Sequence, residues 1–285
     1  MNKKIDKRKK YYLVLDCETA TLPQVNQFAE TARKNIAIAK PLIYDIGWKL
    51  IDRKGKVYKT ESFLITEIFS VPSIFNTAYY KEKRPLYLKK LKKNEITLTN
   101  WNTAINILLQ DLETAEAVGA YNSMFDFKKA LIFTEDYISH LYSNYYYEWE
   151  KMQVASMQRI AEGEKPSNKN FDKDNFIFRN KKYPLFCIWG LTCHHLINND
   201  EYRKFCIKNK FYTASKKYYP TNAEIVYAFL TNNEQFKESH TALEDVNIEI
   251  EILLKVWEKQ KPQKMTMGII YFPFKELGKM EVELE

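Results

Sequence analysis

The chain has no apolar run approaching the roughly 18 residues needed to cross a bilayer. Residues 2–10 are basic and lead directly into a short strand and acidic residues, without the apolar core and cleavage site of a signal peptide. The four cysteines form no CxxC pair, which argues against a disulfide framework in a chain of 285 residues. Internal repeats and low-complexity segments are also absent. These absences predict a cytoplasmic protein that does not associate with membranes.

The composition allows a well-buried core and favours an anionic partner. A length of 285 residues allows one large domain or two small ones. Hydrophobic residues make up 45% of the chain, which is not the composition of a disordered protein. The formal net charge is +8 and the sequence pI is about 9.0. An excess of positive charge suits nucleic acid, although charge alone does not distinguish nucleic acid from a membrane surface.

The first apolar run ends in two acids. Residues 11–19 are aromatic, aliphatic and β-branched, which predicts a buried strand. Side chains alternate along a strand, so Asp16 and Glu18 point to one side and Cys17 to the other. Two such acids repel each other and lose hydration unless a cation lies between them. The pair therefore indicates either a divalent metal site or a solvated strand end.

The following segments predict a mixed sheet with helices around it. Two strand-like runs, 42–51 and 57–65, are joined by a turn containing Gly55, which predicts a hairpin. Apolar spacing predicts helices at 101–112 with Thr99 or Asn100 as cap, from Asn122 or Ser123 to 138, at 185–197, at 221–230 and from His240 to about 260. A short strand is predicted at 117–121, a short helix at 27–34, and a basic connector at 198–219.

Three further stretches have less regular patterns. Residues 79–94 mix lysines with tyrosines, which fits a nucleic-acid groove or a solvated helix face. Residues 139–183 are aromatic and then polar, and they are predicted to be an inserted helix and loop without a core of their own. Residues 268–274 are an apolar run that could close a sheet edge or contact a partner.

Three polar motifs are placed where such elements end. Asp16-x-Glu18 ends the first strand, Asn122-x-x-x-Asp126 follows a central strand, and His240-x-x-x-x-Asp245 opens the last long helix. Sites in α/β sheets gather at the carboxyl ends of central strands. In their order and local context these motifs resemble those of the DEDDh 3′–5′ exonucleases, a family with a ribonuclease-H-like fold that includes the polymerase III epsilon subunit and ribonuclease T.

The resemblance implies an α/β fold, a ribonuclease-H-like mixed sheet flanked by helices. The exonuclease domain would cover residues 11–260 with an insertion at about 139–183, between a basic arm at 1–10 and a tail at 261–285. Asp16, Glu18, Asp126 and Asp245 would hold two divalent cations, Mg²⁺ or Mn²⁺. Asp16 would contact both ions, Glu18 and Asp245 the ion of the nucleophile, and Asp126 the ion of the leaving oxygen, and the product would be a nucleoside 5′-monophosphate.

The resemblance also implies roles for the other motif residues. His240 would be the general base, with an unperturbed pKa near 6.5. Asn122 would position the terminal nucleotide or cap a helix, and the backbone of Thr19 would meet the 3′ end. Phe125 or Phe127 would lie beside the terminal base or pack in the core.

The chain also departs from the family pattern. It lacks the family glycine after Thr19, where residues 20–41 stand instead. It has Phe186-Cys187-Ile188 where the family often carries an aspartate. A zinc site formed by Cys193, His194, His195 and Cys206 is a weak alternative, because the spacing fits no usual finger.

The predicted substrate is a single-stranded 3′ end of DNA or RNA. A polymerase or another replication or repair protein would be a separate partner, and a homodimer is left open. The alternative function is a non-catalytic nucleic-acid-binding module or accessory subunit that keeps the exonuclease fold. The four metal-binding acids and the histidine that catalysis would need are all present, which argues against that alternative.

Overall fold

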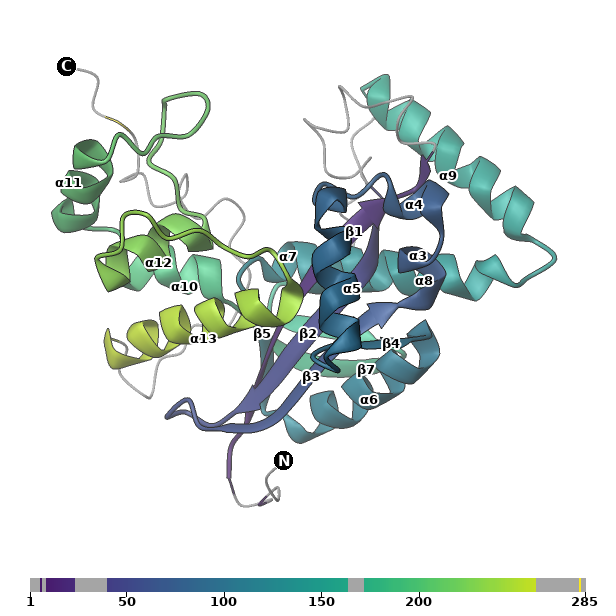
Figure 1. The fold of residues 1–285 in the computed structure, drawn as a ribbon, viewed down its shortest axis with the longest axis horizontal. Coiled ribbons are helices and arrows are strands. Elements are labelled where there is room, and N and C mark those ends of the chain that lie inside the picture. The colour runs from purple at the N-terminus through teal and green to yellow at the C-terminus, as the bar shows by residue number, and fades with distance from the viewer. Residues whose placement is uncertain (1–5, 7–8, 24–39, 164–171, 260–281, 283–285) are drawn as a thin grey trace.

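The computed structural model describes residues 6, 9–23, 40–163, 172–259 and 282 (Figure 1). A seven-stranded mixed sheet has the strand order β4-β3-β2-β1-β5-β7-β6. The strands β1, β2 and β3 pair antiparallel, as do β6 and β7, whereas the pairs β1–β5, β3–β4 and β5–β7 are parallel. Their bounds are β1 Tyr12–Thr21, β2 Pro41–Ile51, β3 Val57–Ile65, β4 Thr97–Thr99, β5 Ala117–Ala120, β6 Asn175–Phe178 and β7 Lys181–Cys187.

Helices cover both faces of the sheet (Figure 1). One face packs against α10 Ile188–His195, α11 Asp200–Lys208, α12 Ala223–Thr231 and α13 Ala242–Lys259. The other face packs against α3 Thr66–Phe69, α4 Pro72–Phe75, α5 Arg84–Lys92, α6 Trp101–Thr114, α8 Ile132–Leu141 and α9 Tyr146–Ala161. Two short elements, α7 Ser123–Phe125 and the π-helix η3 Asp126–Leu131, connect β5 to α8, and the 3-10 turn η2 Lys81–Lys83 leads into α5.

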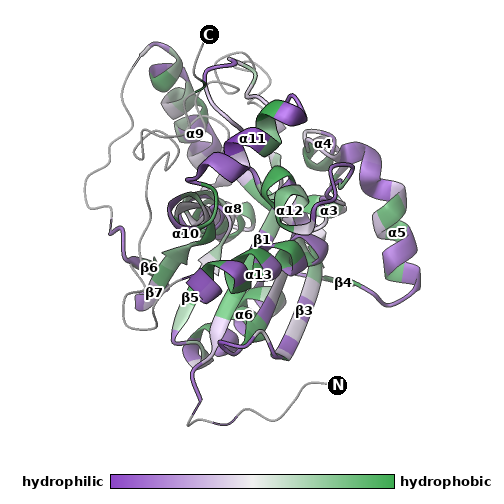
Figure 2. Ribbon diagram, turned by 90° about the vertical axis from the view of Figure 1, so that its left-hand side faces the viewer, coloured by the Kyte–Doolittle hydropathy of each residue, from purple (hydrophilic) through white to green (hydrophobic). Residues whose placement is uncertain are grey.

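Coverage on both faces explains why the first strand is apolar almost throughout. Leu13, Val14 and Leu15 are completely buried, although alternate side chains point to opposite faces. In Figure 2 the hydrophobic residues gather along the central strands and on the helix sides turned toward them. The acids do not end the strand as predicted, because Asp16 and Glu18 are the fifth and seventh of the ten residues of β1 and pairing with β2 continues to Thr21. The apolar run thus places the acids at the centre of the sheet.

The start of α13 lies unusually close to β2. A Cβ built on Gly47 would lie 2.7 Å from the backbone nitrogen of Leu243 and 2.8 Å from its Cα. Only a residue without a side chain allows the helix to approach this far. Asp45, two residues earlier on β2 and fully buried, accepts a hydrogen bond of 2.9 Å from the backbone N–H of Ala242. Together these contacts bring the first turn of α13 against the strand next to β1.

Most of the predicted elements are confirmed. The first strand, the hairpin with its Gly55 turn (φ +78°), the strand after α6 and the last long helix are all present. The Asn100 side chain caps α6 by accepting a hydrogen bond of 2.8 Å from the backbone N–H of Thr103. None of the described helices is long and apolar enough to cross a membrane.

Two secondary-structure predictions were wrong. The helix expected at 185–197 begins only at Ile188, because the preceding residues pair as β7 with β5. The basic connector expected at 198–219 contains α11, whose Tyr202 and Cys206 are buried at helical spacing among charged neighbours. Residues 139–183 supply α9 as predicted, but also β6 and the start of β7. The predicted helix at 27–34 and the run at 268–274 lie outside the described residues.

Candidate active site

A pocket of about 370 Å³ opens where β1, the β5–α7 connection and the start of α13 meet. All six polar residues named in the three sequence motifs line it. Its lining consists of Asp16, Cys17, Glu18, Tyr80, Tyr121, Asn122, Phe125, Asp126, Asn222, Ala223, Glu238, His240, Asp245 and Glu249. Segments that are more than 100 residues apart in sequence therefore contribute to one site.

The two acids of β1 are held close to other acids. Burial raises the pKa of the Asp16 carboxyl well above its usual range, and the charges of Glu249 and Asp126 raise it further. Burial, followed by the charge of Asp245, raises the pKa of Glu18 to about 9. The register of β1 against β2 shifts directly after Glu18. Without a cation, these carboxyls would hold protons at neutral pH.

Asp126 occupies the first position of the π-helix η3 and is only 3% exposed. Burial raises its pKa to about 7, and a hydrogen bond from the Cys17 thiol opposes that rise. The Cys17 Sγ donates to Asp126 Oδ1 over 3.1 Å. Cys17 is buried, as its position opposite the Asp16–Glu18 pair predicts, but it contacts an acid of the site. The Cys17 thiol thereby helps to orient the Asp126 carboxyl in the pocket.

The third motif lies at the start of α13. The His240 Nδ1 is 3.9 Å from Asp245 Oδ2 and 3.6 Å from Glu238 Oε2. Burial, followed by the charge of Glu238, raises the pKa of Asp245 to about 8. Burial and the neighbouring Lys83 lower the pKa of His240, which favours a neutral imidazole at physiological pH. The histidine is thus in the protonation state of a base.

The loop that carries His240 is held by the segment before α5. The His240 ring stacks on the ring of Tyr80, with centroids 4.2 Å apart and planes 12° apart. The Lys83 ammonium lies 4.6 Å from the centre of the Tyr80 ring and donates to the backbone carbonyl of Ser239. His240 itself has φ of +50°, a left-handed conformation that a residue with a side chain adopts only when its surroundings hold it.

The donor atoms of the pocket fit a hard divalent cation. Ligand atoms of Glu18, His240 and Asp245 all lie within 4.8 Å of one another. Among the described residues, Asp245 Oδ1 and Glu249 Oε2 are buried oxygens without a hydrogen-bond partner. Buried carboxylate oxygens cost free energy unless a donor or cation meets them, and oxygen-rich sites suit Mg²⁺ and Mn²⁺. Asp16 and Asp126 lie outside the tightest group and border the same pocket.

Among the pocket residues that the sequence did not predict, Glu249 and Tyr80 act directly on motif residues. Glu249, on α13 and 3% exposed, is the neighbouring charge that acts most strongly on Asp16. Its position four residues after Asp245, on the same helix face, is a signal that the sequence contains. Tyr80 belongs to a segment in which no local pattern indicates contact with His240.

Of the three predicted substrate-binding residues, Asn122 and Phe125 line the pocket and Thr19 does not. The Asn122 side chain caps α7 by accepting from the Phe125 N–H over 3.3 Å, and both residues line the pocket. Thr19 is not among the lining residues and lies on β1 beyond the register shift, opposite Ile43. Phe127 is fully buried against Phe176, which is a core position.

The zinc alternative receives no support from the described part of the chain. Cys193 and Cys206 are buried free thiols, and burial raises the pKa of both to about 12. Neither they nor His194 and His195 belong to a group of described side chains close enough to share an ion.

Comparison with protein-family models, with curated proteins and with solved structures finds no match for this chain.

Proposed function

We propose that this chain is a metal-dependent 3′–5′ exonuclease with a ribonuclease-H-like fold, acting on the 3′ ends of DNA or RNA. One observation carries the proposal: the motif residues Asp16, Glu18, Asp126, His240 and Asp245, from three distant segments, line one pocket. A set of four carboxylates beside a neutral imidazole matches the needs of phosphodiester hydrolysis. The strand order, with a central antiparallel hairpin followed by parallel β5, supports the fold assignment.

Each group has a distinct task in this proposal. Asp16, Glu18, Asp126 and Asp245 hold two divalent cations, which supply charge neutralisation at the phosphate and a more acidic water. His240 accepts the proton of the attacking water, and its lowered pKa keeps it ready to do so. The departing nucleotide keeps its 5′-phosphate. Glu249 adds a further buried carboxylate beside Asp16 and strengthens the demand for positive charge.

The test is incubation with 5′-labelled single-stranded DNA and RNA in Mg²⁺, Mn²⁺ or chelator. We expect a ladder of shortening products from the 3′ end, release of nucleoside 5′-monophosphates, and no products with chelator. Asp16→Asn should abolish the ladder, whereas Asp200→Asn, at a side chain 82% exposed on α11, should leave it unchanged. A ladder of equal intensity from Asp16→Asn would contradict the proposed site.

The variant His240→Ala tests the role of the general base separately from metal binding by the carboxylates. The rate should fall by a factor on the order of 10² to 10⁴, while metal-dependent thermal stabilisation remains. His194→Ala, at an exposed position on α10, is the matched control. An unchanged rate in His240→Ala would remove the general-base role.

A further inference from the structure

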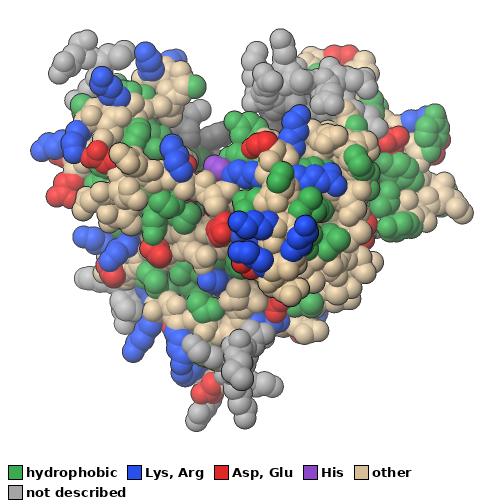
Figure 3. Space-filling model, in the orientation of Figure 1, with side chains coloured by type: hydrophobic (Ala, Val, Ile, Leu, Met, Phe, Trp, Pro, Cys, Tyr) green, Lys and Arg blue, Asp and Glu red, His purple; other side chains and the backbone are tan. Residues whose placement is uncertain are grey.

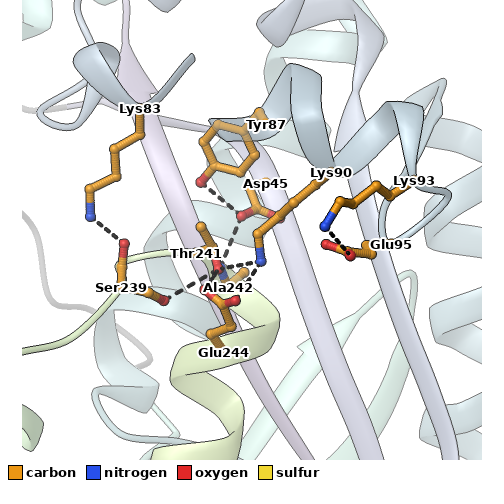
Figure 4. Close-up of polar contacts among 10 residues, drawn as sticks. All are labelled: Asp45, Lys83, Tyr87, Lys90, Lys93, Glu95, Ser239, Thr241, Ala242 and Glu244. Atoms are coloured by element: carbon orange, nitrogen blue, oxygen red, sulfur yellow. Dashed lines mark hydrogen bonds and ion pairs between the residues drawn. The ribbon is translucent and has the colours of Figure 1, made fainter. Parts of the chain in front are cut away.

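The helix α5 has two basic faces, and only one is explained by packing. On its inner side Tyr87 is buried and donates to Asp45 over 2.9 Å, and Lys90 contacts Glu244 over 2.7 Å (Figure 4). Lys83, just before the helix, donates to the Ser239 carbonyl in the same view. These contacts fasten α5 to the first turn of α13.

The outer side of α5 is different. Lys89, Lys92 and Lys93 are exposed, as is Lys81 in η2. Lys93 lies 3.5 Å from Glu95, whereas no ion pair or hydrogen bond joins the side chains of the other three to any described residue. Residues 79–94 contain seven cations and one acid. Figure 3 shows Lys and Arg side chains gathered over α5, and Figure 2 shows this helix at the edge of the molecule.

This outer face is continuous with the pocket. Tyr80 lines the pocket and directly precedes η2. Its neighbour Tyr79 is 84% exposed and meets the Tyr80 ring edge-on, with centroids 4.8 Å apart. An exposed aromatic ring next to a row of exposed lysines combines a stacking surface with phosphate-binding charges. Tyr80 therefore joins the pocket to Tyr79 on one side and to the lysines of η2 and α5 on the other.

We propose that Tyr79 and the outer lysines of η2 and α5 bind the single strand that leads to the nucleotide in the pocket. This inference rests on the proposed function, because it takes the pocket as the place of the 3′ end. The nine residues of α5 extend over about 13 Å, which is enough for a few consecutive phosphates. A membrane surface would use the same charges, but anionic lipid would give no role to the acidic pocket that Tyr80 lines.

The test measures binding of a fluorescent single-stranded oligonucleotide to the whole chain in chelator, where hydrolysis does not interfere, at several salt concentrations. Each neutralised phosphate contributes about 0.7 to the slope of log K against log salt for single strands. Lys89→Gln with Lys92→Gln should therefore lower the slope by about 1.4. Tyr79→Ala should weaken binding at least about 5-fold at constant slope, because it removes stacking and no charge.

The control pair is Lys54→Gln with Lys56→Gln, at exposed positions in the β2–β3 turn, which removes the same charge elsewhere. We expect this pair to keep the slope of the unaltered chain. Equal slopes in the α5 pair and the unaltered chain would overturn the inference, as would an equal loss in both pairs. Binding to vesicles of anionic lipid, without binding to the oligonucleotide, would also overturn it.

The two proposals fail separately. Hydrolysis with an unchanged slope in the α5 pair would refute the binding surface and leave the exonuclease standing. Binding with the expected slopes, without hydrolysis in Mg²⁺ or Mn²⁺, would refute the exonuclease and leave a nucleic-acid-binding surface.

Discussion

The imidazole of His240 lies flat on the phenol ring of Tyr80, 4.2 Å away between ring centres. The two pocket residues come from segments far apart in sequence, Tyr80 before η2 and His240 before α13. Among the described residues, Tyr80 is the ring that packs against His240. The stack holds the histidine in place although its backbone is left-handed. Tyr80 is therefore a positioning residue in the proposed reaction.

Tyr80→Leu should lower the hydrolysis rate on the order of 10-fold, because a misplaced base loses alignment with the water. Tyr80→Phe keeps the ring and should restore most of the rate. The measurement is kcat and KM for a short oligonucleotide, with the loss expected in kcat. If Tyr80→Phe and Tyr80→Leu lose the same activity, the ring does not act through stacking.

Glu249→Gln should stabilise the metal-free protein and weaken its metal binding. The amide keeps an acceptor for the backbone hydrogen bond from Tyr121, and it is neutral without the proton that the buried carboxyl needs beside Asp16 and Asp126. We expect a higher melting temperature in chelator and a higher Mg²⁺ concentration for half-maximal activity. Glu258→Gln, near the exposed end of α13, is the control and should change neither quantity. An unchanged Mg²⁺ requirement would show that Glu249 does not contribute to the affinity of the pocket for the cation.

As pH rises, the stability of the metal-free protein should fall and the gain in stability from added metal should grow. The pKa values of Glu18, Asp245 and Asp126 are raised to about 9, 8 and 7, so the folded protein keeps protons that the unfolded chain releases above its ordinary carboxyl range. Stability contributed by these protons is present at acidic pH and is lost as pH rises through the folded values.

In chelator the melting temperature should therefore fall between about pH 5 and pH 9. Added Mg²⁺ or Mn²⁺ replaces the protons, so the gain from metal should grow over the same range. Thermal melts at fixed ionic strength measure both trends. A metal-induced gain that is equal at pH 5 and pH 9 would show that these carboxyls do not bind the ion.

Gly47→Ala should disturb the site from outside the pocket. The new methyl group would meet the backbone of Leu243, so the first turn of α13 must move away from β2. We expect a loss of about 1–3 kcal/mol in unfolding free energy, and a lower rate because His240 and Asp245 move with that turn. Ser62→Ala, at the position paired with Gly47 on β3, is the control. An unaltered unfolding free energy would mean that the first turn of α13 can move away from β2 without destabilising the protein.

The local patterns that predicted the sheet were strong because burial on both faces imposes them. Each of three signals lies within a single element or turn. They are the apolar run before Asp16, the glycine of the turn at Gly55 and the apolar residues at helical spacing on α13. The boundary at Cys187 could not be predicted in this way. An apolar run of that length suits a strand or a helix, and parallel pairing with β5 decided it.

The resemblance of the three motifs to those of a known family predicted which acids belong together, and all of these acids line one pocket. The sequence by itself thus determined the central strand with its acid pair and the helix that carries Asp245. Only the tertiary structure decided that Glu249 faces Asp16, that Cys17 holds Asp126, and that Tyr80 stacks on His240. The physical reason is distance along the chain: these contacts join segments through packing, which no local periodicity encodes.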